Sequence, residues 1–151
     1  TAQLYNGTVI RTKAGKPSNC GVDFIPSGNF TILSTVLGNV ATKSVIEDKQ
    51  MVDKINSAGR KALSSVLNYP TIDNFMIQAK EFTIKTGLLK DRARDVIEAV
   101  EAVGGKASQA MLGDTVFAIP CEGNEDEVYR VMSEFGEVLR FNSGTSCYSD
   151  L

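Results

Sequence analysis

The chain has 151 residues, of which 42% are hydrophobic and 23% charged, with a formal net charge of −2. This composition is typical of a globular domain, and it offers no basic surface for nucleic acid or an anionic membrane. No apolar run approaches the roughly 20 residues that span a bilayer, and the chain does not open with a charged and then apolar leader. We therefore expect a cytoplasmic domain that binds neither nucleic acid nor membrane.

The cysteines Cys20, Cys121 and Cys147 are odd in number and widely spaced, and the chain contains no histidine. This spacing fits no zinc motif, so we expect reduced structural thiols and no metal ligands. The absence of histidine also removes the commonest general base. Any catalysis would depend on carboxylates, lysine, arginine or backbone dipoles.

Residues 1–29 are rich in glycine, proline, asparagine and serine. One strand is predicted at Thr8–Thr12, and Arg11–Pro17 is typical of a loop. Because this segment has too few apolar residues for a core of its own, we expect a strand and a connection that lie against something else. The main domain is expected over residues 30–151.

The next segment alternates a strand with helices. Phe30–Leu37 is β-branched and apolar throughout, which predicts a strand buried on both faces. Apolar residues then recur at intervals of three and four, as on one side of a helix. Three helices are predicted, at about Gln50–Leu67, from Pro70 or Thr71 to Gly87, and at Lys90–Val103.

The run from Gly104 to Pro120 predicts a β-hairpin. Gly113-Asp114 would form its two-residue turn before the strand Thr115–Cys121, because glycine tolerates the positive φ of a tight primed turn. A helix at Glu125–Phe135 and a strand at Glu137–Phe141 follow. This order predicts an α+β, ferredoxin-like split βαβ fold. We expect an antiparallel sheet of about four strands, helices on one face and extra helices in the first crossover.

Two segments carry residue types that could hold an anion. Arg11 offers a planar fork next to a glycine-containing loop, although an arginine that solvates a strand end is the commoner case. Gly38–Lys43 leaves a strand and enters a helix, so its amides, with Thr42 and Lys43, favour an anion. A helix cap with a solvated lysine is the alternative there. By residue type alone, Gly113 is a turn glycine and Asp114 a surface carboxylate without an identified partner.

The stretch GGKASQAMLGDTVFAIP, residues 104–120, resembles the third, C-terminal motif of the galactokinase, homoserine kinase, mevalonate kinase and phosphomevalonate kinase superfamily. Within it, the chain is most similar to archaeal pantoate kinases. RTKAGKP at 11–17 and GNVATK at 38–43 resemble that branch as well. Of the glycine-rich turn of the wider superfamily, only Gly113 is kept. The resemblance runs from about Arg11 to Phe141.

This resemblance implies the C-terminal half of an ATP-dependent kinase that converts pantoate to 4-phosphopantoate for coenzyme A synthesis. Arg11, Thr42 and Lys43 would bind the substrate, and Gly113 and Asp114 would support the phosphate loop. The complete enzyme would need ATP and Mg²⁺, whose ligands lie in the N-terminal half of the family. The chain has neither that half's nucleotide loop nor a Walker sequence. We expect it to bind no cofactor, to supply no catalytic residue and to be inactive alone.

The expected partners are therefore a small hydroxy acid and the N-terminal kinase half. A free-standing ferredoxin-like module that binds a ligand or regulates another protein is the alternative, and a homo-oligomer is possible. An apolar exposed face would favour the half-kinase. A closed surface with a self-associating sheet edge would favour the module.

Overall fold

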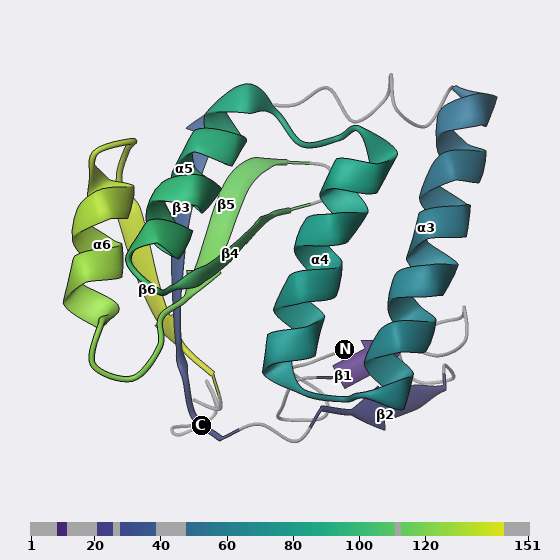
Figure 1. Ribbon diagram of the computed structural model, residues 1–151, viewed down its shortest axis with the longest axis horizontal. Coiled ribbons are helices and arrows are strands. Elements are labelled where there is room, and N and C mark those ends of the chain that lie inside the picture. Colours follow the sequence, from purple (N-terminus) through teal and green to yellow (C-terminus); the bar gives the residue numbers. More distant parts are fainter. Residues whose placement is uncertain (1–8, 12–20, 26–27, 39–47, 111–112, 144–151) are drawn as a thin grey trace, which may run out of the picture.

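The structure is a computed structural model that describes residues 9–11, 21–25, 28–38, 48–110 and 113–143. The strands are β1 (Val9–Arg11), β2 (Val22–Phe24), β3 (Thr31–Gly38), β4 (Lys106–Gln109), β5 (Asp114–Ile119) and β6 (Val138–Asn142). The helices are α3 (Lys49–Asn68), α4 (Ile72–Thr86), α5 (Asp91–Ala102) and α6 (Glu125–Ser133). Figure 1 shows their arrangement.

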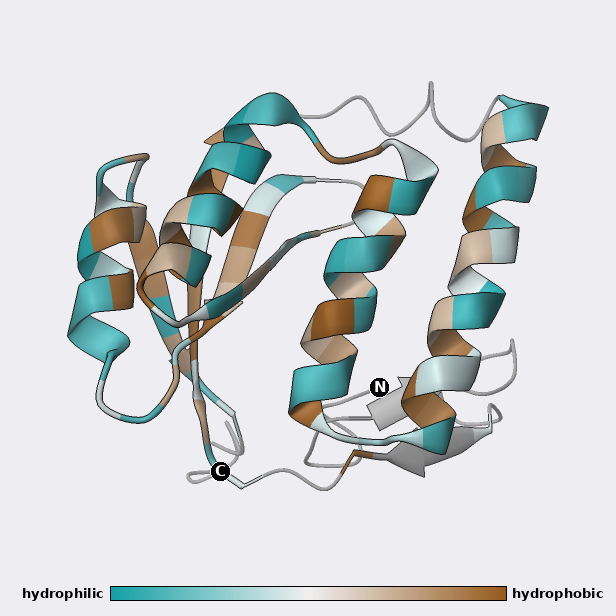
Figure 2. Cartoon of the chain, in the orientation of Figure 1, coloured by the Kyte–Doolittle hydropathy of each residue, from teal (hydrophilic) through white to brown (hydrophobic). Residues whose placement is uncertain are grey.

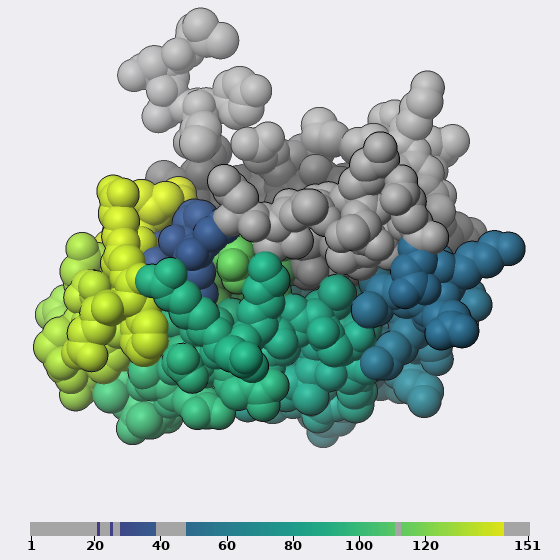
Figure 3. Space-filling view, turned by 90° about the horizontal axis from the view of Figure 1, so that it is seen from above, coloured from purple at the N-terminus to yellow at the C-terminus, as the bar shows by residue number. Residues whose placement is uncertain are grey.

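The main sheet has four antiparallel strands in the order β4-β5-β3-β6. Helices α5 and α6 cover one face, and α3 and α4 pack together beyond the β4 edge (Figure 1). Seen from above, the elements run in a row from α3 at one end to α6 and β6 at the other (Figure 3). The predicted α+β ferredoxin-like fold is confirmed, with α3 and α4 as the extra helices of the first crossover.

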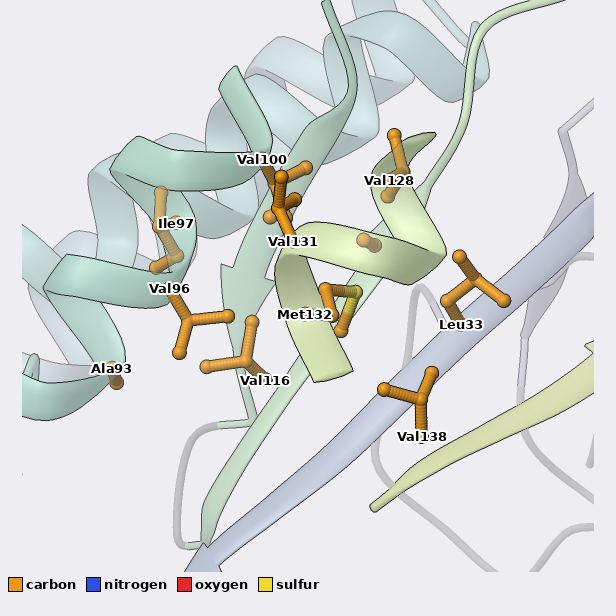
Figure 4. Packing of buried hydrophobic residues seen from close by; sticks show 12 residues of the cluster. Leu33, Ala93, Val96, Ile97, Val100, Val116, Val128, Val131, Met132 and Val138 are labelled. Carbon is orange, nitrogen blue, oxygen red and sulfur yellow. The ribbon is translucent and has the colours of Figure 1, made fainter. Parts of the chain in front are cut away.

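The main core lies between the sheet and helices α5 and α6. Buried apolar residues recur at intervals of three and four along both helices, so each helix turns one apolar side to the sheet. Figure 2 shows this as alternating brown and teal along the helices. The fully buried members labelled in Figure 4 include Leu33 and Val116 from the strands, Val96 and Val100 from α5, and Val128 and Met132 from α6.

Local capping signals explain the bounds of α4. The Thr71 hydroxyl accepts a hydrogen bond from the Asn74 N–H at 3.1 Å, which satisfies one of the free amides of the first turn. Gly87 ends the helix with φ of 74°, a left-handed conformation that favours glycine. The predicted helix from Pro70 or Thr71 to Gly87 is therefore confirmed, together with its caps.

The described part of residues 1–29 differs from the prediction in one respect. β1 pairs with β2, a strand that the sequence did not predict, in a separate two-stranded antiparallel sheet. The following residue, Ile25, is 3% exposed and joins a second, smaller apolar cluster with Val66 of α3 and Phe75 of α4. Ile25, at the end of this segment, thus packs against the α3–α4 pair of its own chain.

The prediction that the first long strand is buried on both faces was wrong. Along β3, Leu33 and Thr35 are fully buried on the side of α5 and α6, whereas Val36 is 59% exposed. The cause is the architecture, because an antiparallel sheet with helices on one face leaves its other face uncovered. Periodicity within β3 could not reveal this.

The hairpin turn also differs from the prediction. Asp114 is the first residue of β5, and the Gly113 N–H donates to the Ala110 carbonyl at 3.2 Å. That is the bond of a four-residue turn, with Gly113 at its last position. Among the described glycines, only Gly87, Gly104 and Gly123 have positive φ. Gly113 is therefore favoured by its turn position and not by a left-handed backbone.

Candidate functional site

The carboxyl end of β3 lies next to the β4–β5 hairpin. Gly38 is the register partner of Asp114, and a Cβ placed on Gly38 would lie 3.0 Å from Asp114 Oδ2. The glycine therefore permits a close approach of the carboxylate. Two predicted segments meet here, the start of 38–43 and the hairpin. Thr42 and Lys43 themselves lie outside the described residues.

Asp114 is not the exposed carboxylate that its residue type suggested. Its side chain is only 16% exposed, and Oδ2 lies 3.5 Å from Lys90 Nζ. Oδ1 is buried and has no hydrogen-bond partner among the described residues. Since Lys90 is half exposed, the ion pair stabilises the fold by at most about 1 kcal/mol. Its main consequence is to fix a carboxylate and an ammonium group at this end of the sheet.

Gln109 fixes the hairpin to the segment that enters α5. It is 4% exposed, and its Oε1 accepts from the Lys90 N–H at 3.0 Å. Its Nε2 donates to the carbonyls of Leu88 at 3.1 Å and Gly113 at 3.2 Å. One buried amide thus holds three backbone groups, as buried polar side chains generally require partners. The sequence analysis missed Gln109, for which the only signal was an amide just before a turn.

Arg92 of α5 binds the backbone at the carboxyl end of β3. Its guanidinium donates to the Leu37 carbonyl at 3.3 Å and to the Phe135 carbonyl at 2.9 Å. Arg92 forms no ion pair with a carboxylate of the described residues. It also lies in the first turn of α5, where the helix dipole is positive and Asp91 supplies a carboxylate. The sequence analysis did not single out Arg92.

Arg11 does not belong to this cluster of described residues. It is the last residue of β1, opposite Val22, in the separate two-stranded sheet. In Figure 1 β1 lies near the turn between α3 and α4, whereas the carboxyl end of β3 lies toward the opposite ends of those helices. Its role in substrate binding stays a prediction, as do those of Thr42 and Lys43.

The described residues contain no group of three or more acidic or cysteine side chains that could hold a metal ion. Cys121, the cysteine within the described ranges, is exposed and forms no disulfide. No helix in the described part of the chain is long and apolar enough to cross a membrane. The described residues at this end of the sheet thus place an ammonium group, a guanidinium group and a mostly buried carboxylate, those of Lys90, Arg92 and Asp114.

Residues 62–138 match the family model described as GHMP kinases C terminal. The chain is 34% identical over 118 residues to the pantoate kinase of Methanocaldococcus jannaschii, a match that covers 78% of this chain and 43% of the relative. It is 29% identical over 133 residues to the pantoate kinase of Thermococcus kodakarensis, covering 87% and 44%. The chain thus spans less than half the length of these relatives.

Two solved kinase structures have a similar fold over most of this chain. A phosphotransferase related to the coenzyme A biosynthesis pathway superposes with a TM-score of 0.75 at 25% identity, over 89% of this chain and 44% of that one. A mevalonate kinase of L. major in complex with R-mevalonate superposes with a TM-score of 0.61 at 10% identity, over 89% and 48%. At that identity the second likeness concerns the fold alone.

Proposed function

We propose that this chain, which belongs to the family of GHMP kinase C-terminal domains, is the substrate-binding half of an ATP-dependent pantoate kinase. The observation that carries the proposal is the 34% identity to a pantoate kinase over 78% of the chain. The reaction would form 4-phosphopantoate, a step in the synthesis of coenzyme A. The meeting of Gly38 with Asp114 supports the proposal, because it joins two segments whose sequences resemble that branch.

Phosphoryl transfer depends mainly on positioning and on the stabilisation of negative charge. In this proposal the segment after Gly38 presents Thr42 and Lys43 to the acceptor. Asp114 and Gly113 hold the hairpin beside that segment. The described residues offer no carboxylate cluster for Mg²⁺, and the sequence has no nucleotide loop. In this proposal the N-terminal half of the family would hold the nucleotide and the metal, and this chain's part would be to orient the acceptor.

The test is reconstitution. The 151-residue chain is co-expressed with the N-terminal half of the M. jannaschii pantoate kinase, so that the two parts can fold together. ADP release is then measured with pantoate, mevalonate and homoserine as acceptors. Release that depends on both halves and on pantoate is expected, and the chain alone should release none. A complex that acts on another acceptor, or product from the chain alone, would contradict the proposal.

A further inference from the structure

Lys90 places an ammonium group beside the carboxyl end of β3. Its Nζ lies 3.5 Å from Oδ2 of Asp114, and Asp114 is the register partner of Gly38, the last residue of β3. The stretch after Gly38 is the one that the proposed function assigns to the acceptor. Lys90 itself comes from the connection between α4 and α5, which no motif of the sequence singled out.

The backbone of Lys90 is fixed on both sides. Its N–H donates to Oε1 of the buried Gln109 at 3.0 Å, and its carbonyl accepts from the Arg94 N–H at 2.9 Å. Lys90 is the N-cap residue of α5, but its side chain makes no capping hydrogen bond. The ammonium group therefore extends from a fixed point of the chain and is not used to cap the helix.

The ammonium group also keeps donors for a ligand. A lysine ammonium has three N–H donors. Among the described residues it has one acceptor, Oδ2 of Asp114, and their 3.5 Å separation exceeds the roughly 2.8 Å of a typical charge-assisted bond. The side chain of Lys90 is 46% exposed. Lys90 can thus donate to a second anionic oxygen and stay beside Asp114.

The neighbouring charged groups are less suited to this task. The guanidinium of Arg92 is held by two backbone carbonyls, those of Leu37 and Phe135. Asp91, between the two cations, lies in the first turn of α5, where a carboxylate is favoured by the helix dipole. Residues adjacent in a helix do not face each other, so Asp91 does not neutralise Lys90 directly.

Asp114 limits where an anion can bind. Its side chain is 16% exposed and its Oδ1 is buried, so packing restricts the carboxylate to this place. Its charge repels a second carboxylate except on the side where Lys90 lies. The pair of Lys90 and Asp114 is half exposed and therefore weak, so an anionic ligand can compete for the ammonium group.

We propose that Lys90 is a substrate-binding residue that contacts the carboxylate of the acceptor. This inference rests on the proposed function, in which the acceptor is a hydroxy acid held beside Gly38. The ammonium group donates a charge-assisted hydrogen bond to the acceptor's carboxylate and so helps to orient its reacting hydroxyl group. Lys90 is thereby a determinant of specificity for an acid over the corresponding alcohol.

The test compares two acceptors in the chain co-expressed with the N-terminal half of the M. jannaschii pantoate kinase. One acceptor is pantoate, and the other is the triol in which a hydroxymethyl group replaces the carboxylate of pantoate. The ratio of kcat/KM for pantoate to kcat/KM for the triol is measured by ADP release. Lys90→Met keeps the length of the side chain and the backbone hydrogen bonds, and Lys90→Arg keeps the charge.

Lys106→Met is the matched control. Lys106 is also a partly exposed, ion-paired lysine, with Nζ 2.5 Å from Oδ1 of Asp73. It lies at the start of β4 opposite Ile119, at the end of the hairpin away from the turn. Circular dichroism of each variant chain should match that of the original, because all three changes replace a side chain that is at least one-third exposed.

We expect Lys90→Met to lower the ratio at least about tenfold, because the triol has no carboxylate to lose a charged partner. The ratio should stay close to its original value in Lys90→Arg and Lys106→Met. An unchanged ratio in Lys90→Met would overturn the inference. Equal losses with pantoate and the triol would overturn it too, because they would assign Lys90 to the fold or to the phosphoryl group.

The same assay separates this inference from the proposed function. If the reconstituted enzyme acts on mevalonate or homoserine and not on pantoate, the proposed function is contradicted. The ratio is then measured with that acid and its own alcohol, and a loss confined to the acid in Lys90→Met would still support the role of Lys90. An enzyme without activity on any of these acceptors would contradict both.

Discussion

Replacing Gln109 by methionine tests the bonding that holds the hairpin to the segment that enters α5. Methionine keeps the length of the side chain and removes the amide. The change leaves the Lys90 N–H and the carbonyls of Leu88 and Gly113 without their partner. Each such bond contributes about 1 kcal/mol, so the free energy of unfolding should fall by roughly 2–4 kcal/mol. For a chain of this size, that corresponds to a decrease in Tm of roughly 5–10 °C.

The assay is urea unfolding followed by circular dichroism, with Gln78→Met as the control. Gln78 is half-buried in α4 and makes one long side-chain hydrogen bond, of 3.5 Å to Asn74. The control should therefore lose less than about 1 kcal/mol. If Gln109→Met is no more destabilising than Gln78→Met, the buried amide does not hold the hairpin and this reasoning is refuted.

Three further changes probe the core, a cap and the site. Gly105→Ala would place a Cβ 2.6 Å from Val100 Cγ1, so we expect a loss of about 1–3 kcal/mol in urea unfolding, and an unchanged midpoint would contradict the packing described. Thr71→Ala removes the N-cap of α4 and should cost about 1 kcal/mol by the same measurement, whereas a neutral result would show that the cap is dispensable. Arg92→Ala frees the end of β3 and should raise the KM for pantoate roughly tenfold in the reconstituted enzyme, about 1.4 kcal/mol, with the KM for ATP unchanged. Arg94→Ala, an exposed change in the same helix, is its control, and equal effects would refute the positioning role of Arg92.

The sequence predicted those elements whose signals are local. Thr71 and Gly87 mark the ends of α4 because a cap depends on residues a few positions apart, and the order of elements then implied the ferredoxin-like fold. The hairpin was predicted, but its turn was assigned to the wrong residues because Gly113 stands last in the turn. β2 was missed because its three residues lie in a segment rich in loop residues.

The parts that could not be predicted depend on contacts between distant segments. Arg92 binds Leu37, which lies 55 residues away in the chain, and Lys90 reaches Asp114 across 24 residues. No spacing rule links such pairs. The apolar pattern of β3 could not show that one of its faces is open either, since that depends on where the helices pack. What the sequence did supply was the pair of segments that meet at Gly38 and Asp114.

The most direct test of the proposed acceptor site is an NMR titration with pantoate. The isotope-labelled chain is used in complex with the N-terminal kinase half, and its backbone amides are followed. We predict saturable shifts at Gly38, Gly113 and Asp114, which lie at the site end of the sheet. Gly123, in the turn after the other end of β5, should not shift. Saturable binding that shifts Gly123 and leaves the other three unchanged would contradict the assignment of this end of the sheet to the acceptor.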